Sequence, residues 1–183
     1  MKKSPRCLTG RGYAATSLID LVNVTGLTKG SIYGNFKNKD EVALAAFQHN
    51  VGFIIKIIRD KIDRAETAVD KLLAYPQAYR SIAQSVLANG GCPVLNTSVD
   101  STAINSILHE AVCKIIQGWR KSITAIIEQG IQDKELSAEV NAESTAEVLI
   151  CLVEGGFAMA KTTGEMSYLQ NSIDQVERII RAL

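Results

Sequence analysis

Apolar residues recur along this chain at the three- and four-residue spacing that places them on one face of an α-helix. The clearest case begins near Lys39, where Asp40 and Glu41 favour the positive end of the helix dipole, and it predicts a helix to about Arg64. Further helices are expected over residues 68–87, 94–100, 103–134, 141–162 and 167–182. Only three prolines occur, which permits long helices, and the sequence predicts an all-α fold.

The ends of these helices also carry signals. Pro76 is expected to kink or break the helix of residues 68–87, and the cluster Asn89–Pro93 to end it. Asn141 or Ser144 is a suitable N-cap for the next-to-last helix. Ser167 is expected to cap the last one.

Residues 16–36 predict two short helices with a glycine-containing turn between them, which is the layout of a DNA-reading helix-turn-helix. Ser17 is a good N-cap for the first helix, Gly26 suits the turn, and Thr28 caps the second. The second helix carries side chains that can donate to phosphates or base edges, namely Lys29, Ser31, Tyr33 and Asn35.

Charge is distributed unevenly, although the net charge is only +1. Residues 1–64 hold 11 Lys and Arg against 5 Asp and Glu, whereas residues 65–183 hold 9 against 14. A basic N-terminal part on an acidic remainder suits a DNA-binding head on a body that avoids DNA.

Several classes of protein are disfavoured. No apolar run approaches the ~20 residues that span a bilayer, and the basic start lacks the apolar core of a signal peptide. The four cysteines lack CxxC spacing and nearby histidines, as expected of reduced thiols in a cytoplasmic protein without a metal site or cofactor. Neither histidine lies in a zinc or nucleophile motif, so an enzyme is not expected.

The helix-turn-helix region resembles the signature of TetR-type bacterial transcriptional regulators over Gly12 to Phe47. The matching residues are Tyr13, Thr16, Gly26, Lys29, Gly30, Ser31, Tyr33, Phe36, Lys39 and Glu41. The loop with Gly91-Cys92-Pro93 also recurs in some branches of that family. The resemblance implies a DNA-binding head over residues 1–47 and a helical ligand-binding and dimerisation body over residues 48–183. Only twelve residues precede Tyr13, so the head's first helix is expected to be truncated.

The resemblance also implies roles in binding double-stranded operator DNA. Lys29, Gly30 and Ser31 would face bases or adjacent phosphates, and Tyr33 and Asn35 would reach the backbone or a base. Thr16, Ser17 and Lys39 would contact phosphates, and Thr28, the cap of the reading helix, also counts among the DNA-binding residues. Gly34 departs from the larger side chains frequent there, so no base preference is carried over.

For the body, the resemblance implies a small-molecule effector that lowers operator affinity. Candidate lining residues are Tyr75, Tyr79, Leu108, Val112, Trp119 and Phe157, with Phe53, Ile57, Ile82 and Ile115 as further candidates. For each of them, plain core is the favoured alternative. Polar groups that could orient the ligand are Gln84, Asn105, His109 and Gln117. Two interpretations of Cys92 are open: a sensor of oxidants or electrophiles, and a small buried side chain. The second is favoured, because no Lys, Arg or His is adjacent in sequence to activate the thiol.

The last two helices raise the question of assembly. The helix near residues 146–158 is apolar or small around most of its surface, and the last helix carries an apolar stripe from Ile173 to Leu183. Either a second subunit covers them as a four-helix bundle, or both are simply core. A dimer is favoured, since two heads can read the half-sites of a palindromic operator.

Two functional hypotheses follow. The first is a homodimeric repressor released from DNA by a ligand, with an activator left open. The second is a dimeric ligand-binding protein whose head no longer binds DNA.

Overall fold

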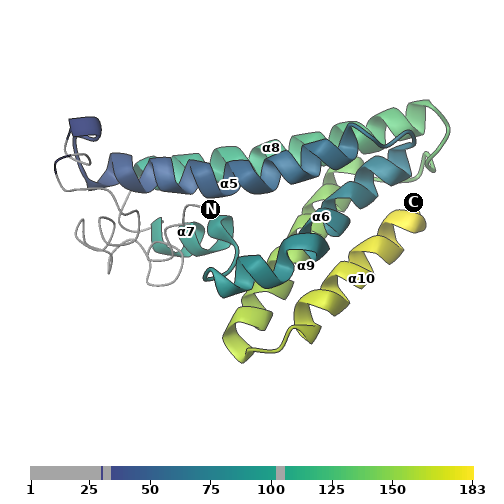
Figure 1. Ribbon diagram of the computed structural model, residues 1–183. Coiled ribbons are helices and arrows are strands. Elements are labelled where there is room, and N and C mark those ends of the chain that lie inside the picture. Colours follow the sequence, from purple (N-terminus) through teal and green to yellow (C-terminus); the bar gives the residue numbers. More distant parts are fainter. Residues whose placement is uncertain (1–29, 31–33, 102–105) are drawn as a thin grey trace.

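The computed structural model describes residue 30, residues 34–101 and residues 106–183. The helices of this part are α5 (Lys39–Ile62), α6 (Ala68–Ala88), α7 (Pro93–Ser101), α8 (Ser106–Gln132), α9 (Ala142–Thr163) and α10 (Ser167–Arg181), and no strand occurs among the described residues (Figure 1). The predicted all-α class is confirmed, and the helices follow the expected ranges closely. The expected domain boundary after residue 47 falls inside α5 and stays a prediction.

Side-chain caps set several helix ends. Asn38 accepts a hydrogen bond from the Glu41 backbone N–H, and Asn141 does the same for Ser144, which decides between the two expected caps of α9. Gly164 ends α9 with a φ of 78°, in the left-handed region that glycine adopts freely. The cap predicted at Ser167 is wrong: Ser167 is already helical, and Met166 before it provides no side-chain acceptor.

Pro76 does not break its helix, so the expectation of a break there is wrong. α6 continues from Ala68 to Ala88 with Pro76 inside it. A proline removes one backbone hydrogen bond, which buried packing on both sides offsets. Leu73, Ala74, Ala78 and Tyr79 are all buried around it.

α6 and α8 each contact four other helices, α6 packing against α5, α8, α9 and α10, and α8 against α5, α6, α7 and α9. α5 and α8 run alongside each other, while α6, α9 and α10 cross them obliquely (Figure 1). α7 packs against both α5 and α8. Among the most fully buried side chains are Leu72, Ile127, Phe157, Leu169, Ile173 and Ile180, which come from four helices and form one core.

By length and composition alone, α5 is the one described helix that could cross a membrane. Its apolar residues Val42, Phe47, Val51, Ile54 and Ile58 are buried in the body. The same pattern is normal for a core helix of a globular protein.

α9 and α10 differ in how their apolar residues are covered. The stripe of α10 is buried within the chain, where Leu169, Ile173, Val176 and Ile180 are at most 2% exposed. The chain's own core therefore covers these four residues of the stripe, whereas Ile179 and Leu183 are only partly buried. α9 buries one face, but Val148 and Met159 on its other side are 46% and 47% exposed.

Candidate functional site

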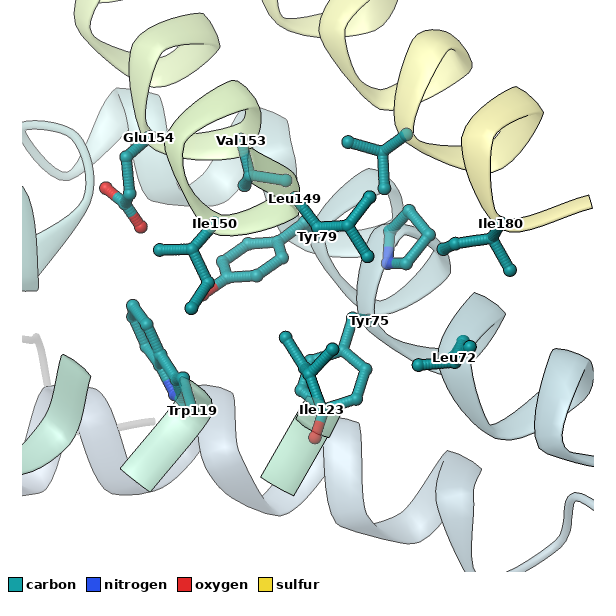
Figure 2. A pocket seen from close by; sticks show the side chains of 12 residues that line it. Leu72, Tyr75, Tyr79, Trp119, Ile123, Leu149, Ile150, Val153, Glu154 and Ile180 are labelled. Carbon is teal, nitrogen blue, oxygen red and sulfur yellow. The ribbon is translucent and has the colours of Figure 1, made fainter. Parts of the chain in front are cut away.

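A cavity lies between four helices of the body. It comprises about 420 Å³ of space free of protein atoms, part of which opens to solvent. Its walls are apolar and aromatic, with one carboxyl group at one end (Figure 2). The twelve lining residues come from α6 (Leu72, Tyr75, Pro76, Tyr79), α8 (Trp119, Ile123), α9 (Leu149, Ile150, Val153, Glu154) and α10 (Val176, Ile180).

Helical spacing explains why these residues meet. On α6 Leu72 and Tyr79 lie three or four residues from the adjacent pair Tyr75 and Pro76. On α9 two adjacent pairs, 149–150 and 153–154, are four residues apart, so each set shares one face of its helix. The aromatic wall is held by ring contacts. Tyr79 packs edge-on against Trp119 at 6.4 Å and against Phe157 at 5.6 Å between ring centroids. The Tyr75 hydroxyl donates to Ser122 Oγ at 2.8 Å.

Glu154 is the carboxyl group of the cavity. Its Oε1 accepts a hydrogen bond from the Cys92 thiol at 3.2 Å, whereas its buried Oε2 has no partner among the described residues. Burial raises the pKa of Glu154 to about 7, and the bond from Cys92 opposes that rise only in part. The carboxyl group is thus poised between its neutral and charged forms near neutral pH. The buried indole Nε1 of Trp119 also lacks a protein partner in the described structure.

Cys92 lies outside the cavity lining but is tied to it through Glu154. Gly90 and Gly91, with φ of 102° and 94°, turn the chain so that Cys92 enters the core ahead of α7. Cys92 is 1% exposed, and its pKa is raised well above the ordinary value by burial first and then by the nearby Glu154. A buried, protonated thiol fits the small-core interpretation and not an electrophile sensor.

The structure brings together three of the six residues predicted for the ligand site, Tyr75, Tyr79 and Trp119. Leu108 and Val112 are buried core residues that do not line the cavity, and Phe157 packs behind Tyr79. The further apolar candidates Phe53, Ile57, Ile82 and Ile115 do not line it either. Of the polar candidates, Gln84, His109 and Gln117 are exposed away from the cavity, and Asn105 lies outside the described residues.

Sequence reasoning missed Glu154, the group with the most distinctive chemistry. Its signal was available, because Glu154 is a lone carboxylate in the apolar and small run from Val148 to Ala160. A charge that interrupts the buried side of such a helix marks a candidate site. Leu72, Ile123 and the α10 residues carried no comparable signal, since each is an ordinary core type.

Most of the predicted DNA-binding residues, namely Thr16, Ser17, Thr28, Lys29, Ser31 and Tyr33, lie outside the described residues, and their roles stay predictions. Gly30 and Asn35 are exposed, and Lys39 is the first residue of α5. Two hydrogen bonds of Glu41 stabilise the start of that helix. Glu41 donates its backbone N–H to Asn38, and its carboxylate accepts the N–H of Lys37 at 2.7 Å.

Within the described ranges, no group of three or more His, Cys, Asp or Glu side chains could hold a metal ion. Cys92, Cys113 and Cys151 are free thiols there.

Two family models match the chain. The model of bacterial regulatory proteins of the tetR family matches residues 3–46, and that of the tetracyclin repressor-like C-terminal domain matches residues 68–176. Among curated proteins, the uncharacterised HTH-type transcriptional regulator YxaF of Bacillus subtilis is 22% identical, over 93% of this chain and 87% of its own length.

Solved structures with a similar fold are also regulators of this type. A TetR-family regulator from Cytophaga hutchinsonii is 34% identical, with a TM-score of 0.89 over 99% of this chain and 90% of that one. FadR of Bacillus subtilis, solved in complex with stearoyl-CoA, has the same fold at 18% identity and a TM-score of 0.78, over 97% of this chain and 93% of its own. From these matches over both parts, the chain belongs to the TetR family of bacterial transcriptional regulators.

Proposed function

We propose that this chain is a cytoplasmic, homodimeric repressor that binds a palindromic operator and is released by a small molecule held in the body cavity. Members of the family bind operator DNA and small-molecule effectors and act as dimers, and they are generally not enzymes. The single observation that carries the effector part is the apolar cavity with the unpaired Glu154 oxygen at one end. A buried carboxyl group without a full set of partners is unfavourable in the empty protein and favours a ligand that supplies the missing donor.

The contacts around the cavity offer a route to the head. Glu154 on α9 accepts from Cys92, which directly precedes α7, and α7 packs against α5. The first residue of α5, Lys39, is one of the predicted phosphate contacts. A ligand that pairs with Oε2 would draw the Glu154 carboxyl group toward the cavity and lengthen its Oε1 contact with Cys92. That displacement would shift α7 and α5, and with them the head.

A second tie joins the same elements. The Lys161 ammonium on α9 donates to the Asn96 side chain of α7 at 2.7 Å, and Asn96 donates in turn to the Gly90 carbonyl at 2.7 Å. α9 is therefore linked to α7 and the residue before it at two points, Glu154 to Cys92 in the interior and Lys161 to Asn96 near the surface. The surface tie limits how far α7 moves when the inner one is released.

The open face of α9 supports a dimer. Val148, Cys151, Gly155 and Met159 follow each other at helical spacing, and all four are exposed. No neighbouring heavy atom lies within 4 Å of where a Gly155 Cβ would stand, so a second helix could approach closely there. An apolar stripe of this kind favours burial against the same stripe of a second copy.

A gel shift of the full chain against DNA flanking its own gene tests the repressor proposal. We expect a shift that weakens as salt rises, because phosphate contacts release counterions. A Lys29→Ala, Tyr33→Ala double variant should lose the shift, whereas Lys121→Ala, an exposed lysine of α8, should keep it.

The rival hypothesis, a dimeric ligand-binding protein with a head that no longer binds DNA, predicts a different result. A folded dimer that shows no shift at low salt would refute the repressor proposal and support the rival. A reporter gene placed behind the operator separates a repressor from an activator. Producing the protein in that strain should lower reporter expression if it is a repressor and raise it if it is an activator.

A further inference from the structure

The charge inventory of the cavity is one-sided. None of the twelve described residues that line it is Lys, Arg or His, and Glu154 is its only carboxyl group. An anionic ligand would therefore meet a like charge with no cation to neutralise it. The phosphate groups of an acyl-CoA, the kind of molecule bound by FadR, would find no cationic side chain among these residues.

One of the two carboxyl oxygens of Glu154 has no hydrogen-bond partner in the described structure. The Cys92 thiol serves Oε1, and it is a weak donor. Oε2 is buried and has no partner in the described structure. When Glu154 is charged, an occupant of the cavity satisfies Oε2 by bringing a hydrogen-bond donor or a positive charge of its own. The neutral carboxyl group instead carries a hydroxyl that donates to an acceptor.

The aromatic side chains favour the positively charged option. Tyr75, Tyr79 and Trp119 border the same cavity as Glu154, with Trp119 on the same side as the carboxyl group in Figure 2. Aromatic faces attract cations, and the attraction grows where water is excluded. The remaining lining side chains are aliphatic and suit an apolar body.

We propose that the cavity takes a lipophilic molecule with a protonated nitrogen, whose cationic end meets Glu154 Oε2 and whose apolar part lies among the aromatic and aliphatic side chains. The inference deepens the proposed function, and it rests on it only in treating this cavity as the effector site. The chemical class is a hydrophobic amine, as opposed to a neutral or acidic apolar molecule.

Binding of such a ligand depends on pH in a defined direction. The titratable groups beside Glu154 are Cys92 and Tyr79, while Tyr75 lines the same cavity and the described lining residues of α8 and α10 do not titrate. The pKa values of Cys92 and Tyr79 are raised well above their ordinary values and that of Tyr75 is also raised, so these groups stay neutral around pH 7. Only Glu154 then changes charge, and amine affinity should rise about tenfold between about pH 6 and pH 8.

The test compares three probes with one skeleton: 4-phenylbutylamine, 4-phenylbutanol and 4-phenylbutyrate. The chain has a single tryptophan, Trp119, so its fluorescence under indole-selective excitation reports directly on the cavity. We expect the amine to bind more tightly than the alcohol and the acid to bind least. Titration calorimetry below pH 7 in buffers of different ionisation enthalpy should show that the protein releases protons when the amine binds.

Two variants on α9 distinguish the effect of the Glu154 carboxyl group from the effect of removing any negative charge. Glu154→Gln should weaken the amine about tenfold or more and leave the alcohol nearly unchanged. The matched control is Glu147→Gln, also on α9 but outside the cavity, where the carboxylate pairs with Arg120 at the surface. Glu147→Gln should bind all three probes as the parent does.

The outcomes decide the proposal. Equal binding of alcohol and amine, preference for the acid, an amine affinity insensitive to Glu154→Gln, or no saturable response at millimolar amine would each overturn it. The proton release in the unaltered protein decides the matter even if the Gln variant folds poorly. A working gel shift without amine binding would reject only the ligand class, whereas amine binding without a gel shift would reject only the repressor.

Discussion

Replacing Glu154 with glutamine should change how the stability of the protein depends on pH. The ordinary pKa of a glutamate is 4.5, and the folded protein raises it to about 7. The folded state therefore holds the proton more tightly than the unfolded chain. Stability from this group is full below pH 4.5 and is lost as pH rises through about 7.

The size of the loss follows from the two pKa values. The difference between them corresponds to about 3 kcal/mol of unfolding free energy once pH exceeds 7. Glutamine is neutral throughout and loses nothing in this window. The stability of Glu154→Gln relative to the parent should therefore increase by about 3 kcal/mol from about pH 4.5 to about pH 7.5.

Urea unfolding followed by Trp119 fluorescence measures this difference at each pH. Protein concentration must be held constant, since a dimer's stability depends on it. Glu147→Gln serves as the control, because its exposed ion pair with Arg120 contributes little. A difference between parent and Glu154→Gln that stays constant within about 1 kcal/mol across the range would refute the reasoning.

Three further predictions concern packing, assembly and thiol chemistry. Gly156→Ala should lower the unfolding free energy by about 1–3 kcal/mol, because the new Cβ would lie 2.8 Å from the Ser172 Cβ. Gly118→Ala, where the space is open, should raise it by up to about 1 kcal/mol in the same denaturation assay. Gly155→Arg should convert the dimer to monomer in sedimentation without unfolding it, and Gly118→Arg should not; an unchanged dimer in both would place the interface elsewhere. Cys92 should react with a thiol reagent only at the rate of unfolding, measured by mass spectrometry, and fast labelling would contradict its burial.

Much of the fold could be predicted because its signals are local. Periodic apolar residues, the Asn141 cap and the glycine after α9 fix helix ranges from a few neighbouring residues. Pro76 and Ser167 show where local signals fail. Burial around Pro76 outweighs one lost hydrogen bond. Helical dihedrals at Met166 start α10 one residue earlier than expected, so that Ser167 is inside the helix and cannot be its cap.

The cavity could be predicted only in part, because it depends on which faces of four helices meet. Tyr75, Tyr79 and Trp119 stood out as large aromatic residues in a chain with few of them. Phe157 has the same chemistry but faces the back of Tyr79 instead of the cavity. No spacing along the sequence distinguishes a residue that lines a space from one that packs behind it.

Glu154 connects these observations into one mechanism. A buried carboxyl group with one unpartnered oxygen costs stability, and natural chains keep such groups mainly where function requires them. Here the same group faces the cavity with one oxygen and holds Cys92, at the start of α7, with the other. If Glu154 were only a tolerated defect, Glu154→Gln would gain stability at neutral pH and leave the effector response of operator binding unchanged. If the carboxyl group couples cavity to head, the variant should gain the same stability but stay bound to operator even when ligand saturates its cavity. Saturation excludes the weaker ligand binding expected of Glu154→Gln as the cause.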